Sequence, residues 1–314
     1  MSYRTELPQL GDRVFLTDGG IETTLIFHEG LDLPLFAAFD LLKDDEGTEA
    51  LRRYYEPYLE LARERGLGFV LESPTWRASP RWAGELGYGA DQLDDLNRRA
   101  IALMEQLRDA HEGSGPIVIS GCIGPQDDGY DPQGMLSADE ARAYHSVQIG
   151  TFADTSADMV CAITMTYADE ATGVTRAALD AGLPAAISFT LETDGRLPSG
   201  QGLGEAIEQV DAETDSGPAY YMINCAHPTH FDSVIEGGAP WAGRIRGLRA
   251  NASTKSHAEL DESEELDEGD PDDLGPRYAA LRDRLPRLNI LGGCCGTDHR
   301  HVCAVRDAWF ESRK

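Results

Sequence analysis

The sequence carries little positive charge. Lys and Arg number 27 against 55 Asp and Glu, so the formal net charge at pH 7 is −28. Only three of these cations are lysines, namely Lys43, Lys255 and Lys314. A surface this acidic repels phosphate backbones and the anionic faces of membranes. Neither nucleic acid nor a membrane is therefore expected as a partner.

The chain also lacks long apolar runs. No stretch reaches the ~18 to 20 apolar residues of a membrane span. The N-terminal residues lack the apolar segment of a signal peptide. We therefore expect a cytoplasmic protein whose partners are small molecules, with a homo-oligomer left open.

What the chain does contain is a series of short apolar runs separated by amphipathic stretches. The runs cover residues 14–20, 68–74, 116–125, 158–165, 183–191, 220–226, 244–252 and 288–296. Apolar residues at helical spacing recur between them, at 51–62, 91–112, 137–156, 168–182, 202–214 and 298–312. This alternation predicts an α/β protein with a parallel sheet, and eight such units in ~300 residues match a (β/α)8 TIM barrel.

A doubly wound open sheet is the alternative fold. Its nucleotide-binding versions carry a Gly-x-Gly-x-x-Gly motif after the first strand or a Walker-type lysine motif. Neither motif occurs in this sequence. We therefore predict a single barrel over residues 1–314.

One segment interrupts the pattern. Residues 259–273 read ELDESEELDEGDPDD and have too little apolar surface to pack against a core. They are predicted to form a solvated acidic surface loop before the last helix–strand unit. A cation-binding segment is the alternative interpretation.

Three of the six cysteines are predicted to meet at one rim of the barrel. Cys225 ends the sixth apolar run, and Cys294 and Cys295 end the eighth. Active sites of such barrels lie at the carboxyl ends of the strands. Three thiolates that leave one position open match a zinc site of the catalytic kind.

Adjacent cysteines need a turn before they can share one metal, because neighbouring side chains of a strand point to opposite faces. The flanking glycines permit such a turn, and they are Gly292, Gly293 and Gly296. The alternative, thiols packed in a core, is the interpretation that we prefer for the other cysteines, Cys122, Cys161 and Cys303.

The histidines give a weaker signal. His299 and His301 open the last helix two positions apart, so they do not share a face and are not predicted to bind one metal. His227 and His230 follow Cys225 and are expected to be solvated loop residues, with the orientation of a metal ligand as the alternative role.

At these residues the sequence resembles the homocysteine S-methyltransferase family. The motifs are Asp18-Gly-Gly, Ser73-Pro-Thr-Trp-Arg-Ala-Ser, Gly124-Pro, Asn224-Cys and Gly293-Cys-Cys-Gly-Thr. The resemblance covers essentially the whole chain and implies a zinc barrel that methylates a thiol. It implies that Cys225, Cys294 and Cys295 bind Zn²⁺.

The resemblance also implies a substrate site. Asp18, Gly19 and Ser73 stand where family members hold the amino acid end of the thiol acceptor. We expect further substrate-binding residues at the neighbouring strand ends, namely Thr75, Trp76 and Asn224.

One position departs from the family pattern. Many members carry a Glu-Thr pair at the end of the fourth strand, and its acid helps to hold the ammonium group of the acceptor. This chain has Ile163-Thr164 instead. We therefore predict that homocysteine is a mediocre acceptor, or that Asp18, Glu22 or Glu72 supplies the missing charge.

The expected mechanism follows from the metal, because coordination to zinc deprotonates a thiol that is mostly protonated at neutral pH. The resulting zinc-bound thiolate would attack the methyl group of a sulfonium or quaternary ammonium donor, such as S-methylmethionine, S-adenosylmethionine or betaine. Aromatic rings recognise such cations. Trp76 is the best placed by sequence, followed by Phe36, Phe39 and Tyr167.

Two other functions remain open from the residues alone. One is a zinc-dependent hydrolase on the same barrel, which would turn over with water and no thiol. The other is a non-catalytic zinc or redox protein, which would show a closed metal site or a Cys294–Cys295 disulfide.

Overall fold

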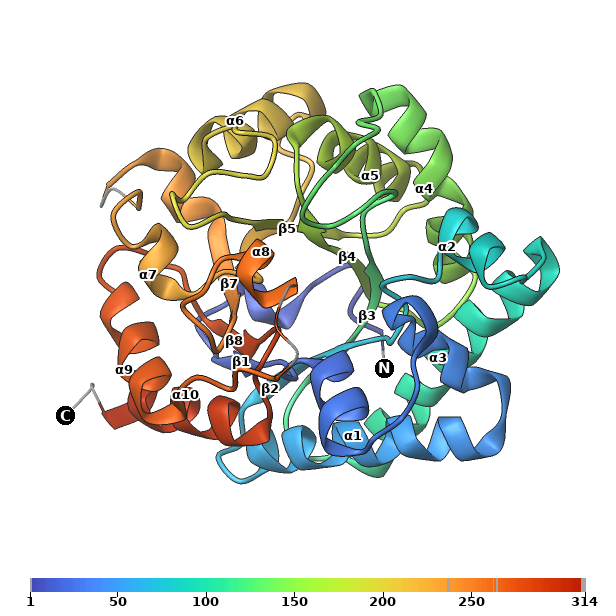
Figure 1. Ribbon diagram of the computed structural model, residues 1–314, viewed down its shortest axis with the longest axis horizontal. Coiled ribbons are helices and arrows are strands. Elements are labelled where there is room, and N and C mark those ends of the chain that lie inside the picture. The colour runs from blue at the N-terminus through green and yellow to red at the C-terminus, as the bar shows by residue number, and fades with distance from the viewer. Residues whose placement is uncertain (1, 236–237, 262, 264, 312–314) are drawn as a thin grey trace.

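A computed structural model describes residues 2–235, 238–261, 263 and 265–311 of the chain. Its strands form one closed barrel in which each strand pairs in parallel with the next and β8 pairs with β1 (Figure 1). The strands are β1 (Phe15–Leu16), β2 (Gly68–Glu72), β3 (Ile117–Ile123), β4 (Met159–Met165), β5 (Ala185–Thr190), β6 (Tyr220–Asn224), β7 (Ile245–Ala250) and β8 (Ile290–Gly293). The predicted (β/α)8 barrel is confirmed, and the open sheet is excluded.

Helices surround this barrel. They are α1 (Asp45–Arg63), α2 (Pro80–Glu85), α3 (Ala90–Ala110), α4 (Ala138–Ala153), α5 (Ala168–Asp180), α6 (Leu203–Thr214), α7 (Pro228–Phe231), α8 (His257–Asp261), α9 (Pro271–Leu281) and α10 (His299–Glu311). Short 3-10 or π turns cover Pro8–Leu10, Thr23–His28, Pro34–Phe36, Ala38–Lys43 and Pro240–Arg244. None of the helices in the described ranges is long and apolar enough to cross a membrane.

The core has two parts. Apolar side chains from the strands fill the inside of the barrel, among them Phe15, Val118, Met222 and Ile290, and Cys161 lies with them as predicted. A larger layer packs between the strands and the helices. Because the barrel interior is filled, a substrate can enter only at an end of the strands.

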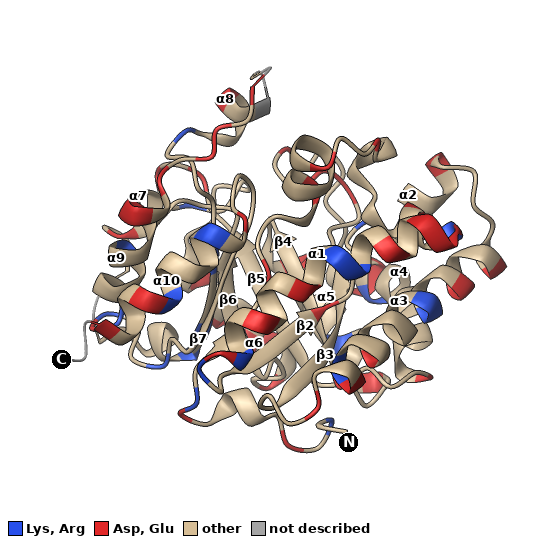
Figure 2. Ribbon diagram, turned by 90° about the horizontal axis from the view of Figure 1, so that it is seen from below, with Lys and Arg blue, Asp and Glu red and all other residues tan. Residues whose placement is uncertain are grey.

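The acidic run is only partly a loop. Residues 259–261 belong to α8 and residues 271–273 begin α9, so the predicted loop over 259–273 is wrong at both ends. Polar caps explain the difference: Glu259 accepts a hydrogen bond from the backbone N–H of Ser256, and Asp270 accepts one from that of Asp272. Residues 262 and 264 of this run lie outside the described residues. Figure 2 shows α8 standing off the barrel at the end opposite the N-terminus.

Candidate metal and substrate site

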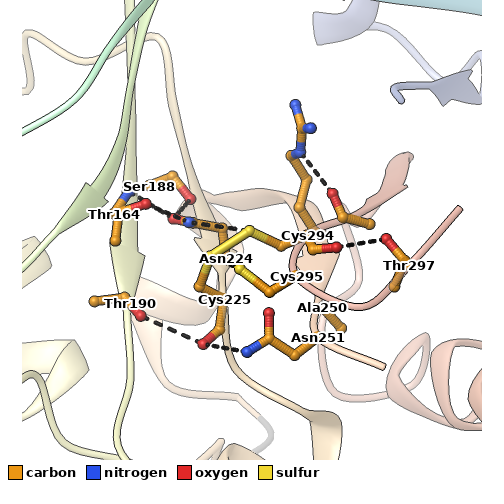
Figure 3. Close-up of a disulfide and its surroundings, with 12 residues drawn as sticks. Thr164, Ser188, Thr190, Asn224, Cys225, Ala250, Asn251, Cys294, Cys295 and Thr297 are labelled. Carbon is orange, nitrogen blue, oxygen red and sulfur yellow. Dashed lines mark hydrogen bonds between the residues drawn. A yellow bond between two sulfur atoms is a disulfide. The ribbon is translucent and has the colours of Figure 1, made fainter. Parts of the chain in front are cut away.

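Three cysteine sulfurs converge beyond the carboxyl ends of β6 and β8. All three lie within 4.8 Å of one another, and the Sγ atoms of Cys225 and Cys295 are 3.9 Å apart. Cys225 and Cys294 are joined by a disulfide, with their Cα atoms 5.4 Å apart (Figure 3). The structure thus brings the three predicted metal ligands together. The disulfide differs from the Cys294–Cys295 bond that the redox alternative predicts.

The glycines around the cysteine pair have two separate roles. A Cβ on Gly292 would lie 2.0 Å from Thr17 Oγ1, and one on Gly293 would lie 2.1 Å from Thr297 Oγ1. These two glycines therefore permit close packing at the end of β8. Only Gly296 of the three has a left-handed backbone, with φ of 77°. The turn that we expected from all three glycines is made by Gly296.

Cys225 has an unusual backbone conformation. Its φ is 51°, in the left-handed region that a residue with a Cβ rarely adopts. Its carbonyl accepts hydrogen bonds from Asn251 Nδ2 at 3.1 Å and from His257 Nε2 at 2.5 Å. Its N–H donates to the carbonyl of Arg249 at 3.1 Å. These contacts hold the strained residue, and with it the sulfur, in one orientation.

Asn224, at the end of β6, is fully buried beside the cysteines. Its Oδ1 accepts from the N–H of Thr164 at 2.9 Å and from Ser188 Oγ at 2.7 Å. Its Nδ2 donates to Thr164 Oγ1 at 2.9 Å and lies 4.0 Å from Cys294 Sγ. Asn224 therefore links β4, β5 and β6 behind the sulfur cluster.

The cysteines form part of the wall of an inner cavity at the carboxyl ends of the strands. Five of the six predicted substrate residues line this cavity, namely Asp18, Gly19, Ser73, Thr75 and Trp76. Ile163 lines it as well. Ser73 and Thr75 share a hydrogen bond of 2.7 Å between their hydroxyl groups.

Asp18 is already paired within the protein. Its Oδ1 lies 2.8 Å from a guanidinium nitrogen of Arg249, and its Oδ2 accepts a hydrogen bond from Tyr54 at 2.8 Å. Arg249 is buried at the end of β7 and also donates to the carbonyls of Gly19 and Gly293. Burial alone would lower the pKa of Arg249, but the neighbouring carboxylates of Asp18 and Glu72 raise it.

Two other carboxyl groups in this cavity lack such a partner. Both side-chain oxygens of Glu72 are buried with no hydrogen-bond partner within the described ranges. Burial raises the pKa of Glu72 to about 7, against the attraction of Arg249. Burial also raises the pKa of Glu22 to about 7, with a contribution from nearby Asp18.

The ring of Trp76, which lines the inner cavity, already has a cation over one face. The guanidinium of Arg77 lies 4.5 Å from its ring centroid. Among the other predicted aromatics, Phe39 is fully buried in the core, and the Tyr167 hydroxyl accepts a hydrogen bond from the N–H of Leu136. Phe36 is 56% exposed and is the only one of the four with a large exposed surface.

Several site residues were missed by the sequence analysis. Arg249 could have been found, since an arginine inside an apolar strand is unusual. Tyr130, whose hydroxyl lies 3.8 Å from Cys295 Sγ, comes from a loop, and His257 begins the short helix α8; neither segment has a sequence period. Their rings lie 4.2 Å apart, and no local sequence signal links them.

His227 and His230 are not solvated as predicted. They are 2% and 7% exposed, because the short helix α7 folds this segment back onto the barrel. His227 accepts a hydrogen bond from the N–H of Thr229 at the start of α7. Burial, and then the charge of Arg277, lowers the pKa of His227 to about 4.

Fold and site together define the class of protein: a (β/α)8 barrel with a thiol-rich centre at the carboxyl ends of its strands, where barrel enzymes place their active sites. The model of the homocysteine S-methyltransferase family matches residues 15–309, and the chain belongs to this family. It is therefore a methyltransferase.

Solved structures agree with this fold. The oxidized form of the homocysteine methyltransferase MmuM from Escherichia coli superposes with a TM-score of 0.70 at 19% identity, covering 94% of this chain and 95% of MmuM. Its metallated form gives 0.68 at 17% identity, covering 95% and 96%. No curated protein sequence matches the chain.

Proposed function

We propose that this protein transfers a methyl group from a sulfonium or quaternary ammonium donor to a thiol acceptor, homocysteine or a related thiol, with zinc held by Cys225, Cys294 and Cys295. The observation that carries the proposal is the convergence of three cysteine sulfurs from two strand ends at one cavity. Family membership supports the transfer of a methyl group to a thiol.

The residues present fit a zinc ion. Thiolates around a tetrahedral zinc with Zn–S bonds of ~2.3 Å lie ~3.8 Å apart. The Sγ atoms of Cys225 and Cys295 are 3.9 Å apart. Within the described part of the chain no further His, Cys, Asp or Glu joins the cluster, which leaves a position for the acceptor sulfur. The disulfide between Cys225 and Cys294 must be reduced before both sulfurs can serve as ligands.

When bound, zinc supplies the means to convert a thiol into a nucleophilic thiolate at neutral pH. The residues of the chain then orient the partners. Asn251 and His257 fix the backbone of Cys225, and Asn224 supports the cluster from behind. Most residues that line the inner cavity are buried, which would limit water beside the acceptor sulfur and disfavour hydrolysis of the donor.

The acceptor's ammonium group is held by Glu72 in this proposal. Asp18 already balances the charge of Arg249, whereas the Glu72 carboxyl has no partner among the described residues. Glu72 and Ile163 line the same cavity, so Glu72 can substitute for the acid that many relatives carry at position 163. Asp18, Gly19, Ser73, Thr75 and Trp76 enclose the rest of the acceptor.

The test is a screen of methyl donors against thiols on reduced, zinc-loaded protein. S-methylmethionine, S-adenosylmethionine and betaine are each offered with homocysteine and with 4-mercaptobutanoate, which lacks the amino group. We expect a methyl thioether product that depends on the thiol.

Cys225→Ser should lower turnover to background together with zinc content, since a catalytic zinc needs all of its protein ligands. Cys303→Ser is the matched control, because Cys303 lies outside the sulfur cluster on α10, and it should retain both. Donor hydrolysis without a thiol, or no transfer from any donor, would contradict the proposal.

A further inference from the structure

A second, outer cavity adjoins the inner one. Four residues line both cavities, namely Glu22, Thr23, Tyr130 and Cys295. Of the three clustered cysteines, Cys225 and Cys294 line only the inner cavity, whereas Cys295 faces both. The two cavities therefore meet at the sulfur cluster.

Methyl transfer by direct displacement needs such an arrangement. The nucleophile and the leaving group must lie on opposite sides of the methyl carbon. An acceptor sulfur in the inner cavity and a donor in the outer cavity would satisfy this requirement, with the methyl group at the boundary beside Tyr130 and Cys295.

The wall of the outer cavity suits a cation. Phe27 and Phe36 lie on it and are 52% and 56% exposed, so their rings are free to contact a bound molecule. Three carboxyl groups line the cavity as well, namely Glu22, Glu265 and Asp267. No Lys or Arg is among the described residues of this wall. Aromatic rings and unbalanced carboxylates both attract positive charge.

Only one of these carboxyl groups is neutralised. Asp267 accepts a hydrogen bond from Ser253 at 2.8 Å and lies 3.3 Å from Lys255 Nζ. Glu22 and Glu265 make no ion pair within the ranges that the structure describes. The cavity also contains the side chain of Asn251, which is 2% exposed and whose Oδ1 has no hydrogen-bond partner among the described residues. An unsatisfied acceptor here suits a donor that carries N–H groups.

The acidic segment is fixed at both ends over this cavity. His257 donates to the carbonyl of Cys225 and lies 3.1 Å from Glu192. At the other end Glu268 pairs with His28 at 2.7 Å and with Arg300 at 3.1 Å. Leu260, Leu266 and Glu265, between these anchors, line the cavity. These described residues are thus part of the wall of the site and not only solvated surface.

We propose that the outer cavity binds the methyl donor, that the donor is a sulfonium compound with a net positive charge, and that Glu22 and Glu265 select that charge. The inference rests on the proposed function, because it needs an acceptor sulfur in the inner cavity. Betaine is disfavoured, since it has no net positive charge for the acidic residues of the described wall to attract.

The transfer is balanced without any further reactant. The acceptor thiol releases its proton to solvent, and its sulfur uses an electron pair to form the new bond to the methyl carbon. The bond between that carbon and the sulfonium sulfur breaks, and its electron pair stays on the departing sulfur as a neutral thioether. Positive charge thus leaves the outer cavity, which weakens the binding of the product there.

The test compares Glu22→Gln and Glu265→Gln with the wild type at pH 8. Calorimetric titration with S-methylmethionine, without acceptor, should show a donor Kd about five- to tenfold higher in each variant, since each loses one attractive charge. The KM for the thiol should stay unchanged in Glu265→Gln. Glu259→Gln is the matched control, because Glu259 belongs to the same segment but lies outside the wall and its amide can still accept from Ser256.

The outcomes separate the two proposals. Two results would overturn the proposed donor site without affecting the proposed thiol methyltransferase function. One is methyl transfer with unchanged donor binding in both variants. The other is use of betaine as efficiently as S-methylmethionine. Absence of transfer from every donor would overturn the proposed function itself. Equally weakened donor binding in Glu259→Gln would show that the overall charge of the segment, and not the carboxyl groups on the cavity wall, attracts the donor.

Discussion

At the end of β2, Glu72 offers a buried carboxyl to the inner cavity. Because burial raises its pKa to about 7, this group is largely protonated at pH 6 and largely ionised at pH 8. Only the ionised form can pair with an ammonium group. The protonation of Glu72 should therefore decide how well an amino acid thiol competes with a thiol that lacks the amino group.

We predict that the ratio of kcat/KM for homocysteine to kcat/KM for 4-mercaptobutanoate rises up to about tenfold between pH 6 and pH 8, the size expected for one charge-assisted hydrogen bond. The effect of pH on the ionisation of the thiols themselves acts on both kcat/KM values and largely cancels in their ratio. Glu72→Gln should make the ratio low and independent of pH. A wild-type ratio that is flat with pH, or a variant that keeps the rise, would contradict the role of Glu72.

A rescue variant tests whether a carboxyl group at another position can replace that of Glu72. Ile163 lines the same cavity, so Ile163→Glu in the Glu72→Gln background places a carboxyl where many relatives carry one. Homocysteine use should recover at least in part, as kcat/KM measured at pH 8. Ile163→Gln in that background is the control of equal size and should not restore it.

Among the elements, α10 fixes the position of the cysteine pair, because it begins just after the loop that carries Cys294 and Cys295. Asp298 accepts a hydrogen bond from the N–H of Arg300 at 2.8 Å and lies 3.2 Å from buried His301. Burial opposes the ionisation of Asp298, but hydrogen bonds from His301 and Arg300 lower its pKa below the usual value of 3.8. The start of α10 is therefore stabilised by an ionised aspartate.

We predict that Asp298→Ala lowers the free energy of unfolding at pH 7 by about 1 to 2 kcal/mol, the usual cost of a lost N-cap. Because the folded-state pKa is lowered, the stabilisation is present above the unfolded pKa and is lost as the pH falls below it. The difference between variant and wild type, measured by urea unfolding, should narrow from pH 5 to pH 3. Asp270→Ala removes the exposed cap of α9 and is the control. Equal stability of Asp298→Ala and wild type at pH 7 would show that Asp298 does not stabilise the start of α10.

The elements also show where periodicity is informative. Helices α1 and α3 repeat apolar residues at helical spacing, so they were predictable from sequence. Helices α2 and α7 have six and four residues, too few for a period to emerge. Strand β1 covers only Phe15–Leu16 of the predicted 14–20, although the backbones of Thr17 and Asp18 still hydrogen-bond to β8; Asp18 and Gly19 then line the cavity.

For the whole molecule, the barrel and the cysteine cluster were predictable because both depend on strand order. Parallel strands end at one rim, so Cys225 and Cys294 were expected at the same rim despite a separation of 69 residues. The pairing of Asp18 with Arg249, the contacts of Tyr130 and His257, and the outer cavity were not predictable. They depend on how side chains from distant parts of the chain meet, which no local pattern records.

The central claim, a zinc ion held by three cysteines with a fourth position for the acceptor thiol, is tested most directly by zinc K-edge X-ray absorption on reduced, zinc-loaded protein. The claim predicts three sulfur ligands at ~2.3 Å and one lighter atom, changing to four sulfurs when homocysteine is added. Three results would contradict this claim. They are a zinc site that already has four protein ligands, a spectrum that homocysteine does not change, and full zinc retention in the Cys294→Ser, Cys295→Ser double variant.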